Sequence, residues 1–258
     1  MIVRIFLIRT KYQRGGLMKK TQFLKLLLVG GLIFSTNSLY ASTKLYQGLG
    51  KSSNFRVGPG KDSENVNVYS FNYVTAAGVF DNEGRVVNLR VDALEVSTPN
   101  YDGSSMPHFS GWPNTQGYNV TDHETKKVTS VSTNTIENIS KEVGEWKTKR
   151  ERGASYGMNP RNEWNKQMDF FENYFKGKTI AEIEEWFAKY TSDINGRPLK
   201  ARSRNEQDKV KYEKLSEKEK AELLDVVAGA TMSIRDNHGD ILGAIKDAYN
   251  NRVEFTVE

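Results

Sequence analysis

Hydrophobic and polar residues alternate along one stretch of the chain in the way that β-strands require. Residues 66–80 are dense in β-branched and aromatic side chains, and residues 85–96 place Val87, Leu89 and Val91 on one face. The intervening Asp-Asn-Glu-Gly has the side chains that favour tight turns. The pattern therefore predicts an antiparallel hairpin.

The segments on either side of this hairpin carry weaker signals. Residues 43–65 are rich in Gly, Ser, Asn and Lys, and they predict a lead-in with one edge strand. Residues 97–119 contain three prolines and three glycines, which exclude regular structure and predict a long loop. Residues 253–257 alternate like a short strand at the end of the sequence.

From residue 134 onward the spacing of apolar residues becomes helical. Capping pairs, prolines and glycines mark the helix ends. The expected boundaries are Asn134 with Glu137, Asn159-Pro160 to Gly177, Thr179 with Glu182, Ser216 with Glu219 through Val227, and Asn237 with Asp240. The expected buried faces are Ile136, Ile139, Val143 and Trp146, then Trp164, Met168, Phe171, Tyr174 and Phe175, then Ile180, Ile183, Trp186, Phe187 and Tyr190, and finally Ile241, Ala244, Ile245, Ala248 and Tyr249.

These elements predict an α+β domain. Its small antiparallel sheet is expected to be covered on one side by helices, with residues 120–215 as a helical elaboration and residues 192–214 as a polar connector. The charge cluster at residues 141–152 is most simply a solvated helix face.

The N-terminal region predicts export. Residues 18–41 have the three parts of a secretory signal peptide, because two lysines precede the apolar run at 23–34 and small polar residues follow it. Cleavage is expected after Ala41, and an uncleaved anchor is the alternative. The protein is then expected in the periplasm or at the cell exterior, with membrane association left open.

Residues 1–17 match neither the signal peptide nor a folded segment. Arg14-Gly15-Gly16 can be encoded by a purine run of the kind that bacterial ribosomes bind, a few bases before the codon of Met18. We therefore predict that translation starts at Met18 and that residues 42–258 form a single domain. A gene without such a run at codons 14–16 would remove this argument.

The charge of the chain lies unevenly along it. The whole sequence carries 37 basic and 32 acidic side chains, but residues 1–41 hold seven of the basic ones and none of the acidic ones. Removing those seven leaves 30 basic against 32 acidic side chains, so no nucleic-acid partner is expected. The chain has no cysteine, which excludes disulfides and thiolate metal sites. Its three histidines are isolated from one another, so no metal site is expected.

The candidate chemistry lies in residues 225–233, which read Asp-Val-Val-Ala-Gly-Ala-Thr-Met-Ser. Two alanines and a glycine let the backbone pass close to a bulky group. Thr231 is expected just before a helix start, where free N–H groups and the helix dipole favour an anion such as phosphate. A small-residue turn that joins two helices is the alternative interpretation.

This segment resembles the acceptor motif of the FMN-binding domain family, which includes exported electron-transfer flavoproteins and the flavin subunits of ion-pumping redox complexes. In that family a flavin transferase uses FAD and magnesium to link FMN through its phosphate to the last threonine of the motif. The resemblance implies that Thr231 is the acceptor, with Asp225, Gly229 and Ala230 as recognition residues. Ala228 departs from the motif, because a hydroxyl residue is usual there.

The resemblance extends over most of residues 46–252. Residues 73–92 are similar to the opening hairpin of the family. Tyr156-Gly157-Met158, Glu163-Trp164 and Gln167 are similar to the helical section of exported members, and residues 236–245 to their last helix. The implied function is extracytoplasmic electron transfer by covalently bound FMN. The implied partners are the flavin transferase, a membrane electron donor and an external electron acceptor.

Several other side chains are candidate walls for the isoalloxazine ring. Met106 and Trp112 lie in the long loop, and Tyr156 and Met158 precede the second helix. Met232 and Ser233, which follow Thr231, are expected among the cofactor-binding residues. For each side chain, ordinary packing onto the core is the alternative.

The sequence names no catalytic acid, base or nucleophile, so a redox carrier is expected before an enzyme with its own substrate. Two alternatives remain open. One is an exported binding or surface protein that has the same fold without flavin, and the other is the flavin subunit of an extracytoplasmic reductase.

Overall fold

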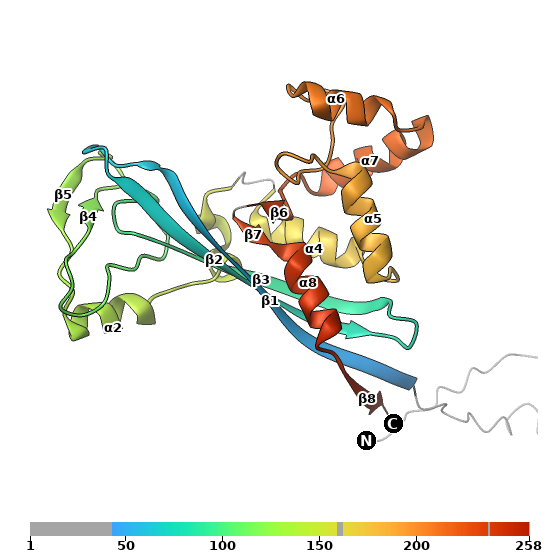
Figure 1. The fold of residues 1–258 in the computed structure, drawn as a ribbon, viewed down its shortest axis with the longest axis horizontal. Coiled ribbons are helices and arrows are strands. Elements are labelled where there is room, and N and C mark those ends of the chain that lie inside the picture. The colour runs from blue at the N-terminus through green and yellow to red at the C-terminus, as the bar shows by residue number, and fades with distance from the viewer. Residues whose placement is uncertain (1–42, 159–161, 237, 258) are drawn as a thin grey trace, which may run out of the picture. The chain divides into compact units, whose positions relative to one another are not determined.

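A four-stranded sheet is the centre of the computed structural model, which describes residues 43–158, 162–236 and 238–257 (Figure 1). Its strand order is β3-β2-β1-β8. The strands are β1 (Thr43–Lys61), β2 (Asn67–Phe80), β3 (Val86–Ser97) and β8 (Val253–Val257). Every second residue of β2 is buried, as its alternating sequence requires. The α+β class is confirmed.

The predicted hairpin is confirmed as the antiparallel pair of β2 and β3. One detail of its pattern is wrong, because Val87 is 43% exposed whereas Leu89 and Val91 are buried. The pairing register shifts between Val79 and Phe80, opposite the start of β3. Such a shift changes which residues face the core, so the period of two does not extend back to Val87.

The first strand differs most from the expectation. Residues 43–65 were expected to form a lead-in with one edge strand, but β1 pairs with β2 along most of its length and has β8 as its other neighbour. Close packing against a helix explains why Gly48 and Gly50 occur in this strand. A Cβ at Gly50 would lie 2.0 Å from the backbone nitrogen of Ala248 in α8 (Ile241–Asn250). The glycines therefore let α8 lie directly on the sheet.

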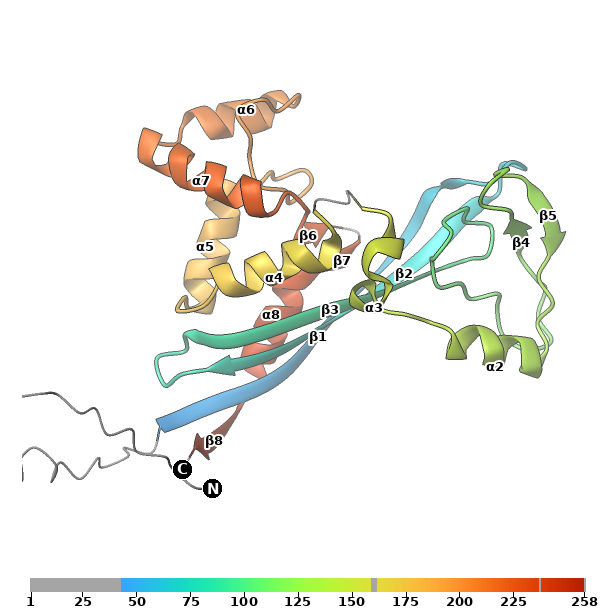
Figure 2. The same cartoon turned by 180° about the vertical axis from the view of Figure 1, so that it is seen from behind.

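The core lies between one face of the sheet and four helices: α4 (Trp164–Tyr174), α5 (Ile180–Tyr190), α7 (Glu217–Gly229) and α8 (Figures 1 and 2). The predicted apolar stripes of α4, α5 and α8 are largely confirmed, with Met168, Phe171, Phe175, Ile183 and Ile245 fully buried. The opposite face of β1 leaves Leu49, Phe55 and Val57 exposed. Helices thus cover one side of the sheet, as predicted.

The helix ends follow their capping residues. The Thr179–Glu182 and Ser216–Glu219 capping boxes are both present. Two predicted ends are corrected. α7 continues to Gly229, two residues beyond Val227, and the N-cap of α8 is Asp240, whose side chain accepts a hydrogen bond from the backbone N–H of Gly243. Asn159, Pro160 and Asn237 lie outside the described residues.

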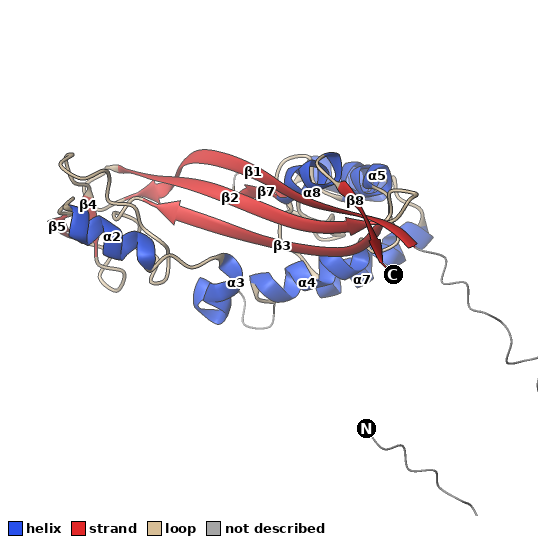
Figure 3. Cartoon of the chain, turned by 90° about the horizontal axis from the view of Figure 1, so that it is seen from below, coloured by secondary structure: helices blue, strands red, loops and turns tan. Residues whose placement is uncertain are grey.

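A second group of elements lies at the other end of the long strands from α5 and α8 (Figure 3). It contains β4 (Asn119–Thr121), β5 (Val128–Val131) and α2 (Ile136–Gly144). Residues 120–215 are therefore not a purely helical elaboration, and they also include the core helices α4 and α5. Thr135, not Asn134, caps α2, and Ile136 and Val143 are exposed. The predicted apolar face of α2 was wrong, because only Ile139 within the helix packs inward.

Short elements complete the chain. They are α3 (Lys149–Arg152), the 3-10 turn η1 (Gly153–Tyr156), α6 (Glu206–Glu213), β6 (Arg235–Asp236) and β7 (Gly239–Asp240). The expected connector at 192–214 thus contains a helix, which Asn205 caps and Tyr212 anchors in the core. No helix in the described ranges is long and apolar enough to cross a bilayer. The predicted start at Met18 and signal peptide at 18–41 lie outside the described residues.

Candidate functional site

Thr231 lies just beyond the C-terminal end of α7, not at the start of a helix. Ala230, the C-terminal cap of α7, is buried and extended, and α8 begins at Ile241, ten residues after Thr231. The expectation of a helix N-terminus at Thr231 is therefore wrong. The nearest helix end carries free carbonyl groups and partial negative charge, which do not attract a phosphate.

A buried glutamine fixes the backbone of this segment. The N–H groups of Thr231 and Met232 both donate to Oε1 of Gln167, at 2.8 and 2.9 Å. The side-chain amide of Gln167 donates in turn to the carbonyl of Asn162 at 2.6 Å, and Gln167 is 1% exposed. These N–H groups are therefore not available to an anion. The side chain of Thr231 is half-buried, and its hydroxyl has no hydrogen-bond partner among the described residues.

The motif residues within α7 have two roles. A Cβ at Gly229 would lie 2.3 Å from ring carbons of Phe170, so this glycine lets α7 pack against α4. Asp225 and Ala228 are exposed, and they share a helix face because they are three residues apart. The side chain of Asp225 forms no hydrogen bond or ion pair with another described residue. The segment before Thr231 therefore presents an accessible surface.

Four of the predicted residues meet at one cavity of about 130 Å³. Tyr156 and Met158 line it from the turn after α3, and Met232 and Ser233 line it from the segment after Thr231. Trp164 of α4 also lines this cavity, together with Tyr156. Thr231 does not line this cavity, but it is bonded to Met232, which does. The fold thus brings together residues that are more than 70 positions apart in the sequence.

Lys149 supplies a buried positive charge to this cavity. It is 2% exposed, and its Nζ lies 3.0 Å from a carboxylate oxygen of Glu95 and 3.2 Å from the carbonyl of His238. Burial acts to lower the pKa of Lys149, but the interactions with Tyr156 and Glu95 outweigh it and raise the pKa. Lys149 is therefore charged at neutral pH.

The other charged or titratable side chains that line the cavity are those of Arg197, Asp236 and His238. Arg197 lines it, and no carboxylate oxygen among the described residues lies within 4 Å of its guanidinium. His238 and Asp236 also line it, with Nδ1 and Oδ2 3.1 Å apart. Burial acts to raise the pKa of Asp236, but the hydrogen bonds with His238 outweigh it and lower the pKa. Asp236 is thus ionised and engaged with its neighbour.

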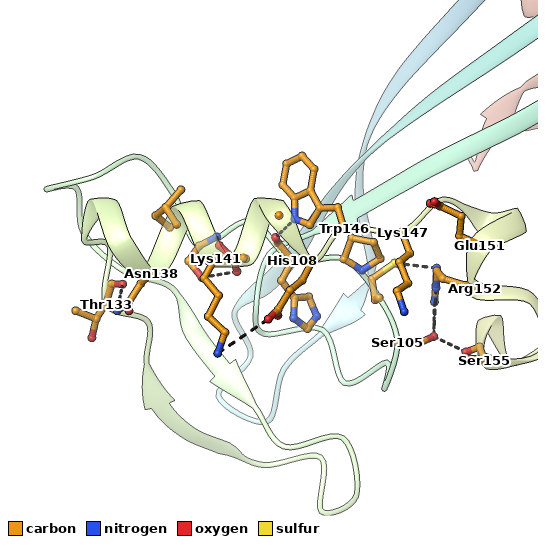
Figure 4. Close-up of a pocket in the computed structure, with 17 residues that line it drawn as sticks. Ser105, His108, Thr133, Asn138, Lys141, Trp146, Lys147, Glu151, Arg152 and Ser155 are labelled. Carbon is orange, nitrogen blue, oxygen red and sulfur yellow. Dashed lines mark hydrogen bonds and ion pairs between the residues drawn. The ribbon is translucent and has the colours of Figure 1, made fainter.

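Met106 and Trp112 lie elsewhere. Met106 is buried, and its Sδ lies 3.7 Å from Nη1 of Arg152, at a separate cavity of about 1070 Å³ (Figure 4). Trp112 is 71% exposed and lines a shallow aromatic depression with Phe55 and Tyr118. The structure does not bring these two loop residues to the cavity that Tyr156 lines.

Sequence reasoning missed the roles of Lys149 and Arg152. The cluster at 141–152 was interpreted as a solvated helix face, but these two side chains are 2% and 7% exposed. The Thr148–Glu151 capping box is the one local signal that marks this short helix. Burial of the two cations depends on β3 and the loop around Ser105, which are distant in sequence. Within the described ranges, no three His, Asp or Glu side chains gather as metal ligands.

Comparison with known proteins gives one informative similarity. Over 224 residues the chain is 36% identical to a chlorophenol reductase from Desulfitobacterium hafniense, which covers 83% of this chain and 60% of the relative. The chain thus spans about three fifths of that protein's length. No protein-family model matches the chain, and no solved structure matches it. The similarity to a protein named as a reductase suggests a redox-related role for this chain.

Proposed function

We propose that this protein is an extracytoplasmic electron-transfer flavoprotein that carries FMN linked by a phosphoester to Thr231. The observation that carries the proposal is the position of Thr231. Its hydroxyl has no hydrogen-bond partner among the described residues. Thr231 comes directly after α7, in which Asp225 and Ala228 are exposed, so an enzyme acting on this motif has access to it. The similarity to a reductase supports the redox part of the proposal.

The chemistry of attachment requires little from this chain. The Thr231 oxygen forms a bond to the phosphorus of the FMN half of FAD, the pyrophosphate bond breaks, AMP leaves, and the hydroxyl proton is released. The demands of phosphoryl transfer are positioning and charge neutralisation, which the transferase and its metal supply. Gln167 contributes by fixing the backbone on both sides of the Thr231 carbonyl.

The residues near Thr231 fit a flavin that lies over a cavity and is not enclosed by it. The cavity of about 130 Å³ is smaller than the roughly 300–1,000 Å³ of enclosed ligand sites. Tyr156, Met158 and Met232 offer aromatic and thioether contacts for one face of the isoalloxazine ring. Lys149 and Arg197 offer positive charge for the phosphate or for the reduced ring. When bound, the flavin supplies one- and two-electron chemistry.

A mass measurement tests the covalent bond. We expect the protein, co-expressed with a flavin transferase, to gain the mass of FMN minus one water. Thr231→Val should abolish this gain and the yellow colour, and it should leave the fold intact because a methyl group replaces one hydroxyl. Ser233→Ala is the matched control, because it removes the other hydroxyl of the segment and should keep the flavin. An unmodified native protein from a competent host would refute the proposal.

A second candidate function is the flavin subunit of a reductase, which the name of the similar protein favours. The two functions differ in how the reduced flavin is reoxidised. A carrier should pass electrons to a small molecule no faster than free FMN does, whereas a reductase should accelerate reoxidation by its own substrate. Stopped-flow absorbance of the reduced protein, mixed with chlorinated phenols and with quinones, measures this difference.

A further inference from the structure

A large cavity lies away from Thr231, between the loop at 105–110, α2 and α3 (Figure 4). Its volume is about 1070 Å³. Part of its lining is apolar or aromatic, and comes from Met106, Pro107, Ile139 and Trp146. Most of the other lining residues are polar or charged, so a cavity of this size suits a small polar ligand that also has an apolar face.

The carboxylates that line this cavity are already engaged. Glu142 accepts hydrogen bonds from the backbone N–H and the hydroxyl of Ser110, at 3.0 and 2.9 Å. Glu151 accepts from the backbone N–H of Thr148 at 2.7 Å, as part of the capping box of α3. Glu145 pairs with Lys141 at 4.0 Å. None of the three lies within 4 Å of the charged groups of Lys147 or Arg152.

Arg152 is a buried cation without a carboxylate partner. It is 7% exposed, and its guanidinium donates to the hydroxyl of Ser105 at 3.2 and 3.0 Å and contacts the sulfur of Met106. No carboxylate oxygen among residues 43–158, 162–236 and 238–257 lies within 4 Å of it. Buried arginines are almost always paired, because desolvating an uncompensated charge is costly.

Two further observations fit this imbalance. Burial lowers the pKa of Arg152 because Tyr156 and Glu95 compensate it only in part. Lys147 also lines the cavity, is exposed, and forms no ion pair with a described residue. Figure 4 labels Lys147 and Arg152 among the side chains that line the cavity. A ligand in the cavity thus meets two cations that have no carboxylate within 4 Å among the described residues, together with the apolar wall to which Trp146 and Pro107 belong.

We propose that this cavity binds a small aromatic anion, with its phenolate or carboxylate oxygen on Arg152 and Lys147 and its ring against Trp146 and Pro107. Arginine suits this role because its planar guanidinium still has N–H groups free for an oxyanion. The site is separate from the flavin site, and binding does not depend on the bond at Thr231.

The position of Arg152 relates this site to the flavin cavity. Its guanidinium lies 4.7 Å from the ring centroid of Tyr156, and Tyr156 lines the cavity beside Met232. Arg152 and Tyr156 therefore form a shared wall between the two cavities. An aromatic anion bound at Arg152 is then one aromatic ring away from the flavin cavity, which is a suitable place for an electron acceptor.

Calorimetric titration tests the proposal with a matched pair of ligands. The probes are 2,4,6-trichlorophenol, which is an anion at neutral pH, and 2,4,6-trichloroanisole, its uncharged methyl ether. We expect the flavin-free protein to bind the phenolate and to bind the ether more weakly. Arg152→Gln should weaken phenolate binding by about 10- to 100-fold, as expected for loss of a charge-assisted hydrogen bond, and leave ether binding unchanged.

Two other variants keep the test decisive if Arg152→Gln does not fold. Lys147→Gln, at an exposed side chain, should weaken phenolate binding, and Arg152→Lys should retain part of it. Lys141→Gln is the control, because it removes a cation of the same cavity that already pairs with Glu145. Equal affinity for phenolate and ether, or equal loss in all four variants, would overturn the proposal.

Discussion

At the scale of single residues, the buried pair of Lys149 and Glu95 ties α3 to β3. Both side chains are 2% exposed and lie 3.0 Å apart. Lys149→Met should therefore lower the free energy of unfolding by about 3–5 kcal/mol, because it leaves a buried carboxylate with only Arg56, at 3.6 Å. The midpoint of chemical denaturation measures the change.

A second substitution separates charge from packing. Glu95→Gln in the Lys149→Met background should recover part of the lost stability, because the amide carries no charge that needs a partner. A double variant as unstable as the single one would show that Lys149 acts through its packed side chain and not through its charge. Where both proteins carry flavin, Lys149→Met should also have a lower flavin midpoint potential than the native protein, because a positive charge beside the ring favours the reduced anion.

Gln167 is the residue on which the geometry of Thr231 depends. Gln167→Met leaves the backbone N–H groups of Thr231 and Met232 without their acceptor. We expect a loss of about 2 kcal/mol or more in stability, since each unsatisfied buried donor costs about 1–3 kcal/mol. Flavin attachment should also fall, as measured by the modified fraction in intact-mass spectra. Lys166→Met, at an exposed position of the same helix, should change neither quantity.

At the scale of elements, the start of α7 is held by Glu219. Its carboxylate accepts from Lys189, from Ser216 and from the hydroxyl of Tyr190, so it joins α7 to α5. The hydrogen bond from Lys189, followed by those from Ser216, lowers the pKa of Glu219 from 4.5 to about 2. Because the folded pKa is the lower one, ionised Glu219 stabilises the fold above pH 4.5, and this contribution is lost as pH falls towards 2.

Removing the charge of Glu219 should therefore change stability in a pH-dependent way. Glu219→Gln should be less stable than the native protein at pH 7, and the difference should shrink between pH 4.5 and 2, when measured by urea denaturation across that range. Glu217→Gln, at the first residue of the same helix, should be close to native throughout. A difference that stays constant with pH would show that the capping geometry, and not the charge, is what Glu219 contributes.

At the scale of the whole molecule, the charge that the sequence suggests is not the charge of residues 42–258. The full chain has a formal charge of +5, but this segment holds 30 basic and 32 acidic side chains. A protein of these residues should therefore pass through a heparin column at near-physiological salt, because no surplus of cations is available to displace counterions. Retention that falls steeply with salt would contradict this expectation.

The whole chain from Lys44 to Val257 forms one compact unit, and its two cavities lie on either side of Arg152 and Tyr156. Residues of both sites lie on or next to the same elements. β3 contains Glu95 and leads into the loop at Ser105, and α4 contains Trp164 and Gln167. The candidate function thus depends on the packing of α3 and α4 against β3. No single segment contains it.

The sequence by itself determined the features that depend on neighbouring residues. The hairpin of β2 and β3, the capping boxes of α5 and α7, and the stripes of α4 and α8 all follow from side chains a few positions apart, whose interactions are local. Tyr156, Met158, Met232 and Ser233 were expected in one cofactor site with Thr231; these four line one cavity, and Thr231 does not line it.

Only the tertiary structure decided the rest. β1 forms a strand because it pairs with β2, and its glycines let α8 pack directly against it. Lys149 is buried because Glu95 lies opposite it. The backbone of Thr231 is held by a hydrogen bond to Gln167, which is 64 residues away in the sequence. Met106 and Trp112 lie apart from that site for the same reason, since a loop takes its position from what it packs against. Contacts between distant residues leave no periodicity in the sequence, so the pattern could not indicate them.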